Sequence, residues 1–149
     1  MNAPGDPQAQ AEAVGRELYA RDPASQALGI ALLEIRPGYA RMRMTVRPDM
    51  VNGHDLCHGG LIFTLADSTF AFACNSHNHA TVAQGASIEF LASGRLGDLL
   101  TAEGIERQAT GRTGVYDIAV TNQDGRTIAL FRGKSFRLGT HILAPPRTA

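Results

Sequence analysis

The segment from Leu61 to Ala73 is the feature that most constrains the fold, because it is apolar almost all the way round when it is drawn as a helix. A helix of this kind lies inside a protein, surrounded by other elements. A single carboxylate, Asp67, stands in the middle of the segment. Aspartate is rarely buried unless it has a partner, so Asp67 has either a partner or a chemical function. The narrow polar side of the helix holds Thr64, Asp67, Ser68 and Asn75.

The residues before this segment, His58-Gly59-Gly60, form the predicted start of the helix. The first N–H groups of a helix have no partner within it and lie at the positive end of its dipole. Glycine lets a ligand approach the backbone closely, so Gly59 and Gly60 indicate a place for a negative or polarised oxygen. A tight turn into an ordinary core helix is the alternative. Asp67 two turns later and Asn52 seven residues earlier favour a functional site.

Alternation of apolar and polar residues predicts strands on both sides of the helix. Tyr39 to Arg47 alternates strictly, and further strands are predicted at 28–34, 81–91, 99–107, 112–121 and 126–138. The last four are expected to follow one another as a meander, with a hairpin turn at Asp124-Gly125. Near the N-terminus, Gln8 to Arg21 is helix-prone, and Asp22-Pro23 is predicted to end that helix.

Three short motifs resemble the signature of the hotdog-fold acyl-CoA thioesterases, namely Asn52-Gly53-His54, Cys57-His58-Gly59-Gly60 and Leu65-Ala66-Asp67-Ser68. The nearest subgroup is the thioesterases of phenylacetic acid degradation, known as PaaI. The resemblance covers about residues 28–138. It implies an α+β hotdog fold, in which an antiparallel sheet wraps around one long central helix, here with a short N-terminal helix. We therefore expect a tail and peripheral helix at 1–22, the hotdog thioesterase domain at 23–140 and a C-terminal tail at 141–149.

The resemblance also assigns roles in thioester hydrolysis. The backbone N–H of Gly59 is expected to stabilise the oxyanion, and Asn52 to position the water or the thioester. Asp67 is expected to act either as the general base that activates water or as the nucleophile that forms an anhydride. Ser68 would help to hold the water. His58 is expected to shape the loop, and it is the alternative base because imidazole suits that role near neutral pH.

In the family each site is shared between two chains, which implies a homodimer and, by the same resemblance, a homotetramer built from dimers. Helix geometry agrees with a shared site. Asp67 lies eight residues after Gly59, which is about 12 Å along a helix at roughly 1.5 Å per residue. A carboxylate at that distance would act on a carbonyl held by the other subunit. A hotdog protein also commonly extends its sheet through its partner.

The same resemblance implies an aryl-acetyl-CoA substrate, phenylacetyl-CoA or a ring-hydroxylated form of it, hydrolysed to the free acid and CoA in phenylacetate catabolism. No metal or redox cofactor is expected, and coenzyme A is part of the substrate. The acyl group would lie against apolar side chains near the helix, and the CoA phosphates would meet basic side chains near the edge of the sheet. The candidate substrate-binding residues are Gly60, Phe63, Phe90, Arg95, Arg112, Lys134 and Arg137.

Three other functions stay open at this point. Zinc-type ligands occur at Cys57-His58, Cys74, His77 and His79, although no paired Cys-x-x-Cys spacing is present. Asp49 and His54 have a spacing like that of hotdog enoyl-CoA hydratases, but the proline of that motif is absent. A non-catalytic acyl-CoA sensor is the third. Regulatory hotdog proteins of that kind carry a DNA-binding helix-turn-helix, and the N-terminal segment is too short for one.

Composition limits the partners further. Lys plus Arg and Asp plus Glu are both 14 in 149 residues, so the formal net charge is zero, which argues against a chain-wide surface for nucleic acid. The N-terminal sequence lacks the apolar run of a signal peptide, and the central apolar segment is too short to span a bilayer. Cys57 and Cys74 are expected to be reduced. These observations predict a cytoplasmic protein with neither a nucleic-acid nor a membrane partner.

Overall fold

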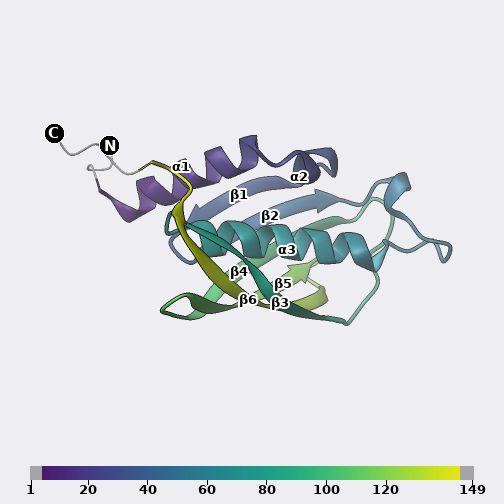
Figure 1. Cartoon of the computed structure of the whole chain (residues 1–149). Helices are drawn as coiled ribbons and strands as arrows, with labels where there is room; N and C mark the ends of the chain where they lie inside the picture. The colour runs from purple at the N-terminus through teal and green to yellow at the C-terminus, as the bar shows by residue number, and fades with distance from the viewer. Residues whose placement is uncertain (1–4, 145–149) are drawn as a thin grey trace.

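A curved antiparallel sheet around one long helix forms the centre of the molecule (Figure 1). The computed structural model describes residues 5–144. The helices of this range are α1 (Pro7–Ala20), α2 (Pro23–Ala27) and α3 (Gly59–Asn75), with a 3₁₀ turn at Pro48–Met50. The strands are β1 (Ala31–Arg36), β2 (Tyr39–Thr45), β3 (His79–Phe90), β4 (Leu99–Thr110), β5 (Thr113–Thr121) and β6 (Thr127–His141). Their order is β1-β2-β4-β5-β6-β3, so the predicted α+β hotdog arrangement is confirmed.

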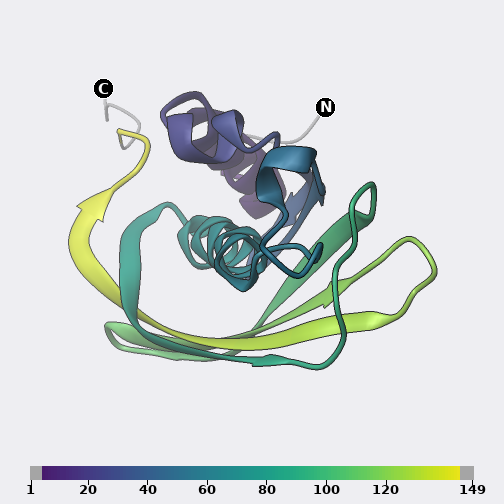
Figure 2. The ribbon, with the colours of Figure 1, turned by 90° about the vertical axis from the view of Figure 1, so that its right-hand side faces the viewer.

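Helix α3 lies across the concave face of the sheet, and Figure 2 shows it nearly end-on inside the curve. The buried residues on it are Ile62, Leu65, Ala66, Thr69, Phe70, Phe72, Ala73, Cys74 and Asn75. The predicted buried helix is therefore confirmed. Thr64, Asp67 and Ala71, which are only partly buried, follow one another at spacings of three and four and so form one stripe. No helix in the described range, α3 included, is long and apolar enough to cross a membrane.

An especially close contact joins α3 to the sheet at Phe70. A Cβ built on Gly133 of β6 would lie 2.8 Å from three carbon atoms of the Phe70 ring. The same ring packs against Tyr116 and Phe131, with centroids 5.6 and 5.9 Å away. Protein interiors are packed as densely as organic crystals, so the missing side chain at Gly133 is what allows the helix to lie this close to the sheet.

The strand that follows the central helix does not pair as predicted. The sequence pattern favours a meander of the last four strands, but β3 pairs with β6 at the edge of the sheet. The chain then crosses through residues 91–98 to reach β4, which lies beside β2. The prediction was wrong because alternation identifies a strand but not its neighbour. The rest of the meander, β4-β5-β6, is confirmed, and so is the turn at Asp124-Gly125, where Gly125 has a φ of 77°.

As an edge strand, β3 leaves most of its side chains exposed in the single chain. Val82 and Phe90, which belong to the apolar side of the predicted strand, are 45% and 52% exposed. The unpaired edge of a long strand is a template for pairing with another strand. The far side of β3 is therefore a surface where a second chain can extend the sheet.

The predicted N-terminal helix is confirmed, but a second short helix was missed. Asp22-Pro23 does end α1, and the same pair also begins α2, because Asp22 caps that helix and Pro23 opens its first turn. The parts of the predicted tails at 1–4 and 145–149 lie outside the described residues, and His141 is the last residue of β6. The proposed domain limits stay a prediction.

The contact between Phe70 and Gly133 generates a test of the core. We expect Gly133→Ala to lower the free energy of unfolding by about 1–3 kcal/mol, because the added methyl group displaces a ring that has no room to move. Urea unfolding followed by circular dichroism measures this change. Gly53→Ala is the control, because a Cβ at Gly53 meets no atom within 4 Å. Equal unfolding midpoints for Gly133→Ala and the wild type would contradict the proposed tight packing.

Candidate active site

The start of helix α3 is capped by the side chain of the residue that precedes it. His58 precedes the helix, and its Nδ1 accepts a hydrogen bond from the Gly60 N–H at 2.9 Å. The N–H of Gly59, the first helical residue, has no acceptor among residues 5–144. A donor at the positive end of the helix dipole that lacks a partner is suited to bind an anionic oxygen. The structure thus presents Gly59 as the donor that the sequence predicts.

The cap also bears on His58 as a base. A neutral imidazole has one donor nitrogen and one acceptor nitrogen. Because Nδ1 accepts the Gly60 hydrogen bond, the proton of the neutral ring lies on Nε2. His58 in this arrangement has no free acceptor nitrogen with which to remove a proton from water. Its geometry supports the predicted role in shaping the loop rather than the alternative role as base.

Asn52 organises the loop before the helix. Its Oδ1 accepts hydrogen bonds from the N–H groups of His54 and Leu56, at 2.9 and 3.2 Å. Its backbone N–H donates to the Leu56 carbonyl at 2.8 Å. With the side-chain oxygen used inside the loop, Asn52 can meet a substrate only through the donor N–H groups of its amide. Asn52 is therefore expected to act on a substrate as a hydrogen-bond donor.

Two aromatic rings border the helix start. A Cβ built on Gly59 would lie 3.1 Å from Cζ of Phe90, so the Phe90 ring stands beside the candidate oxyanion donor and would have to shift to admit a larger residue at position 59. The Phe63 ring packs edge-on against Phe131, with centroids 5.2 Å apart. Phe63 is partly buried, while Phe90 is largely exposed. The structure therefore brings one of the two predicted acyl-binding rings directly to Gly59.

Asp67 lies in the partly buried stripe of α3, and its carboxylate receives no hydrogen bond from the described part of the chain. Burial raises the pKa of this carboxyl above its usual range, because desolvation disfavours the charged form. A raised pKa brings a carboxylate closer to the operating range of a general base. Residues 5–144 supply no hydrogen-bond partner for this carboxylate, and the predicted chemical role of Asp67 stays a prediction.

The neighbouring Ser68 has a contact that the sequence did not reveal. Its Oγ lies 2.9 Å from Oγ of Ser25 in α2, and Ser25 in turn donates to the Asp22 carboxylate at 2.6 Å. Ser25 is 2% exposed. A signal for α2 was present, since Asp-Pro with a hydroxyl residue two positions later is typical of a helix start.

Within one chain, the four basic residues predicted to bind CoA do not lie close together. Arg95 pairs with Leu56 and so lies beside the Asn52 loop. Lys134 lies on the outer face of the sheet, since its neighbours in β6 face the helix. Arg112 donates to the Arg137 carbonyl at 3.5 Å, at the end of the sheet near the C-terminus of α3. That end is about 25 Å from Gly59, the length of α3 at roughly 1.5 Å per residue.

The alternative ligand sets are also separated. Cys57 lies in the loop before α3 and Cys74 near its end, and within residues 5–144 no three His, Cys, Asp or Glu side chains gather as a metal site requires. Asp49 of the hydratase-like spacing is held in an ion pair by Arg47, with a distance of 3.0 Å between Nε and Oδ1. His54 is exposed.

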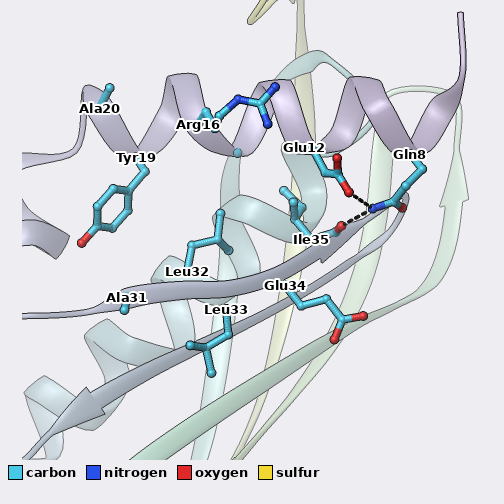
Figure 3. Close-up of a pocket in the computed structure, with 11 residues that line it drawn as sticks. Gln8, Glu12, Arg16, Tyr19, Ala20, Ala31, Leu32, Leu33, Glu34 and Ile35 are labelled. Carbon is cyan, nitrogen blue, oxygen red and sulfur yellow. Dashed lines mark hydrogen bonds between the residues drawn. The ribbon is translucent and has the colours of Figure 1, made fainter. Parts of the chain in front are cut away.

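A groove of about 600 Å³ lies elsewhere, between α1 and β1 (Figure 3). Its end is closed by Gln8, whose side-chain amide donates to Glu12 and to the Ile35 carbonyl, both at 2.9 Å. None of the predicted site residues lines this groove. Gly59 and Asp67 are both partly buried in the single chain.

Comparison with known proteins places this architecture in a family. A family model described as the thioesterase superfamily matches residues 54–129. The acyl-coenzyme A thioesterase PaaI of Escherichia coli K12 is 49% identical over 125 residues, which cover 84% of this chain and 89% of the relative. The structure of the E. coli PaaI protein superposes with a TM-score of 0.89 at 46% identity, covering 90% of this chain and 97% of that one.

A hypothetical thioesterase from Streptococcus pneumoniae TIGR4, whose structure was solved with coenzyme A, is 28% identical with a TM-score of 0.73. That match covers 75% of this chain and 90% of the other. This match agrees with the family model and with the E. coli relative. The chain belongs to the thioesterase superfamily and has its hotdog fold.

Proposed function

We propose that this thioesterase hydrolyses an aryl-acetyl-CoA, phenylacetyl-CoA or a ring-hydroxylated form of it, to the free acid and CoA in cytoplasmic phenylacetate catabolism. One observation carries the chemistry: within residues 5–144, α3 presents an N–H without an acceptor at its first residue, Gly59, and a partly buried carboxylate without a hydrogen-bond donor at Asp67. The substrate class is supported by the E. coli relative, which is named an acyl-coenzyme A thioesterase and comes from the phenylacetic acid degradation operon.

Hydrolysis of a thioester needs a polarised carbonyl. The Gly59 N–H would donate to the carbonyl oxygen, and its hydrogen bond would strengthen as negative charge develops there. The Asn52 amide, free to donate, would position the thioester from the adjoining loop. The Phe90 ring beside Gly59 would exclude water from that side and contact the aryl group. These groups bind and polarise, but none of them activates water.

Asp67 supplies the missing function. As a general base its carboxylate takes a proton from water while the water oxygen bonds to the carbonyl carbon. The C–S bond then breaks, and the thiolate of CoA leaves and takes up a proton. As a nucleophile it would form an anhydride that water hydrolyses. In both routes the carboxylate acts in its ionised form.

One chain cannot bring these groups to one carbonyl. Gly59 and Asp67 are on the same rigid helix, about 12 Å apart at roughly 1.5 Å per residue. We therefore propose a homodimer in which the edge of β3 pairs with its partner and the Asp67 of each chain faces the Gly59 of the other. The exposed edge and apolar side chains of β3 support this arrangement. A two-fold interface repeats the contact, so each dimer has two sites.

A tetramer of two such dimers is a further part of the proposal. Ile105 and Leu130, on the outer face of the sheet, are 38% and 48% exposed in the single chain. Association of a second dimer on this face would cover them. The CoA phosphates would lie toward Arg95, the one predicted basic residue next to the Asn52 loop.

A panel of acyl-CoA thioesters tests the proposed substrate. Phenylacetyl-CoA and ring-hydroxylated phenylacetyl-CoA are expected to release thiol with a higher kcat/KM than linear acyl-CoAs of similar size, as measured with a thiol-reactive dye. Preference for linear chains would reject the aryl-acetyl substrate. Binding of the whole panel without any release above the buffer control would replace hydrolysis with the sensor function.

A second prediction concerns Asp67. Asp67→Asn keeps the size of the side chain but removes the base or nucleophile, so turnover is expected to fall by roughly 10² to 10⁴, with KM and the circular dichroism spectrum unchanged. In the wild type, kcat/KM is expected to rise with pH as the carboxyl ionises. The midpoint should lie above the usual pKa of an aspartate, because burial raises the pKa of Asp67.

The same two measurements can contradict this assignment. A folded Asp67→Asn protein with wild-type turnover would exclude Asp67 from both roles. An acid limb that persists unchanged in the residual activity of Asp67→Asn would show that a different group titrates.

A further inference from the structure

A chain of hydrogen bonds connects the active-site helix to α2. The Asp22 carboxylate accepts two hydrogen bonds from Ser25, from its N–H at 3.0 Å and from its Oγ at 2.6 Å. The Ser25 Oγ is in turn 2.9 Å from the Ser68 Oγ. Ser68 follows Asp67 directly in α3, and like Asp67 it is only partly buried. These hydrogen bonds therefore end at the residue next in sequence to Asp67, to which the proposed function gives the central role.

The direction of these hydrogen bonds follows from the number of protons. An ionised carboxylate only accepts, and a serine hydroxyl has one proton to give. The Ser25 proton goes to Asp22, so Ser25 can only accept from Ser68. The Ser68 proton is thus directed toward Ser25, and the remaining lone pairs of its oxygen are free to accept a hydrogen bond from a neighbouring group.

Helix α2 is fixed in place, which keeps Ser25 at this position. The guanidinium of Arg47 donates to the Ala27 carbonyl at 3.1 Å while it pairs with Asp49. The N–H of Ile30 donates to the Ser25 carbonyl at 2.9 Å. These contacts hold the C-terminal half of α2, the Asp22 cap holds its start, and the buried Ser25 hydroxyl therefore has a defined orientation.

We infer that Ser25 is a positioning residue, which directs the Ser68 proton away from the reacting water so that the Ser68 oxygen accepts a hydrogen bond from that water. This inference rests on the proposed function. With Asp67 as general base, one water proton goes to its carboxylate and the other is held by Ser68. The water oxygen is left with a lone pair directed at the carbonyl carbon. Asp22, which lies outside the site, sets the direction of these hydrogen bonds.

The experiment reverses the direction of the hydrogen bond between Ser25 and Ser68. In Asp22→Asn the side-chain oxygen still caps α2 through the Ser25 N–H, and the amide NH₂ takes the place of the second carboxylate oxygen. That NH₂ donates to Ser25 and frees the Ser25 proton, which then has Ser68 as its acceptor, so that the Ser68 proton turns toward the water. We expect kcat for aryl-acetyl-CoA to fall about threefold to tenfold, the equivalent of one neutral hydrogen bond, with KM unchanged.

Two further variants make the test specific. Ser25→Ala is expected to lower kcat by a similar factor. Adding Asp22→Asn to Ser25→Ala should cause no further loss, because the hydrogen bonds between Asp22 and Ser68 are already broken. Asp6→Asn is the matched control, since Asp6 caps α1 through the Gln8 N–H as Asp22 caps α2, without contact to Ser68. It should leave kcat unchanged.

The outcomes separate this inference from the proposed function. A wild-type kcat in Asp22→Asn would overturn the inference, and because this variant keeps the cap it is decisive even if Ser25→Ala fails to fold. Losses that multiply in the double variant would also overturn it, because they would show that the two residues act independently. If Asp67→Asn retains turnover, the proposed function itself fails. If Asp67→Asn is inactive while Asp22→Asn and Ser25→Ala both keep the wild-type kcat, only the role of Ser25 is rejected.

Discussion

The packing of α3 against the sheet is the constraint on which the rest of the structure depends. The Phe70 ring lies against the bare backbone of Gly133 and packs on Tyr116 and Phe131, which fixes the helix close to the sheet. A rigid helix fixes the separation between the donor at Gly59 and the carboxylate of Asp67 at about 12 Å, at roughly 1.5 Å per residue. A gap of this size makes it difficult for the two groups to meet at one carbonyl within one chain, and the proposed dimer brings them together from two chains.

The burial of Asp67 on this helix agrees with the catalytic role proposed for it. Burial raises its pKa above that of an aspartate in an unfolded chain, so the folded protein binds the proton more tightly than the unfolded one. Ionisation at higher pH therefore lowers the free energy of unfolding, and the charged form needed for catalysis is the less stable one. A residue that costs stability in its working state is typical of an active site.

Much of this architecture could be predicted from the sequence, because the signals are local. The apolar helix, its start at His58-Gly59-Gly60 and the alternation of β2 all follow from periodicity and capping chemistry. The pairing of β3 with β6 could not be predicted, since alternation carries no information about neighbours. The site residues that resemblance assigns keep their proposed roles, and geometry narrows two of them: Asn52 to a donor and His58 to a cap.

The residues that sequence reasoning missed are those whose roles depend on contacts with residues far away in the sequence. Ser25 is 43 positions from Ser68, and nothing local joins them. Basic residues were predicted from charge alone, and charge does not reveal which end of the sheet a side chain occupies. Arg95 reaches the Asn52 loop only because of a bridge to Leu56.

The shared site is the central claim, and complementation between two inactive chains tests it most directly. Asn52→Ala and Asp67→Ala are each expected to be nearly inactive as homodimers. In a heterodimer isolated with two different tags, one site carries both defects and the other carries neither, so about half of the wild-type activity per dimer should return. A heterodimer as inactive as its parents, when wild-type chains survive the same procedure, would contradict the shared site and require both residues to act within one chain.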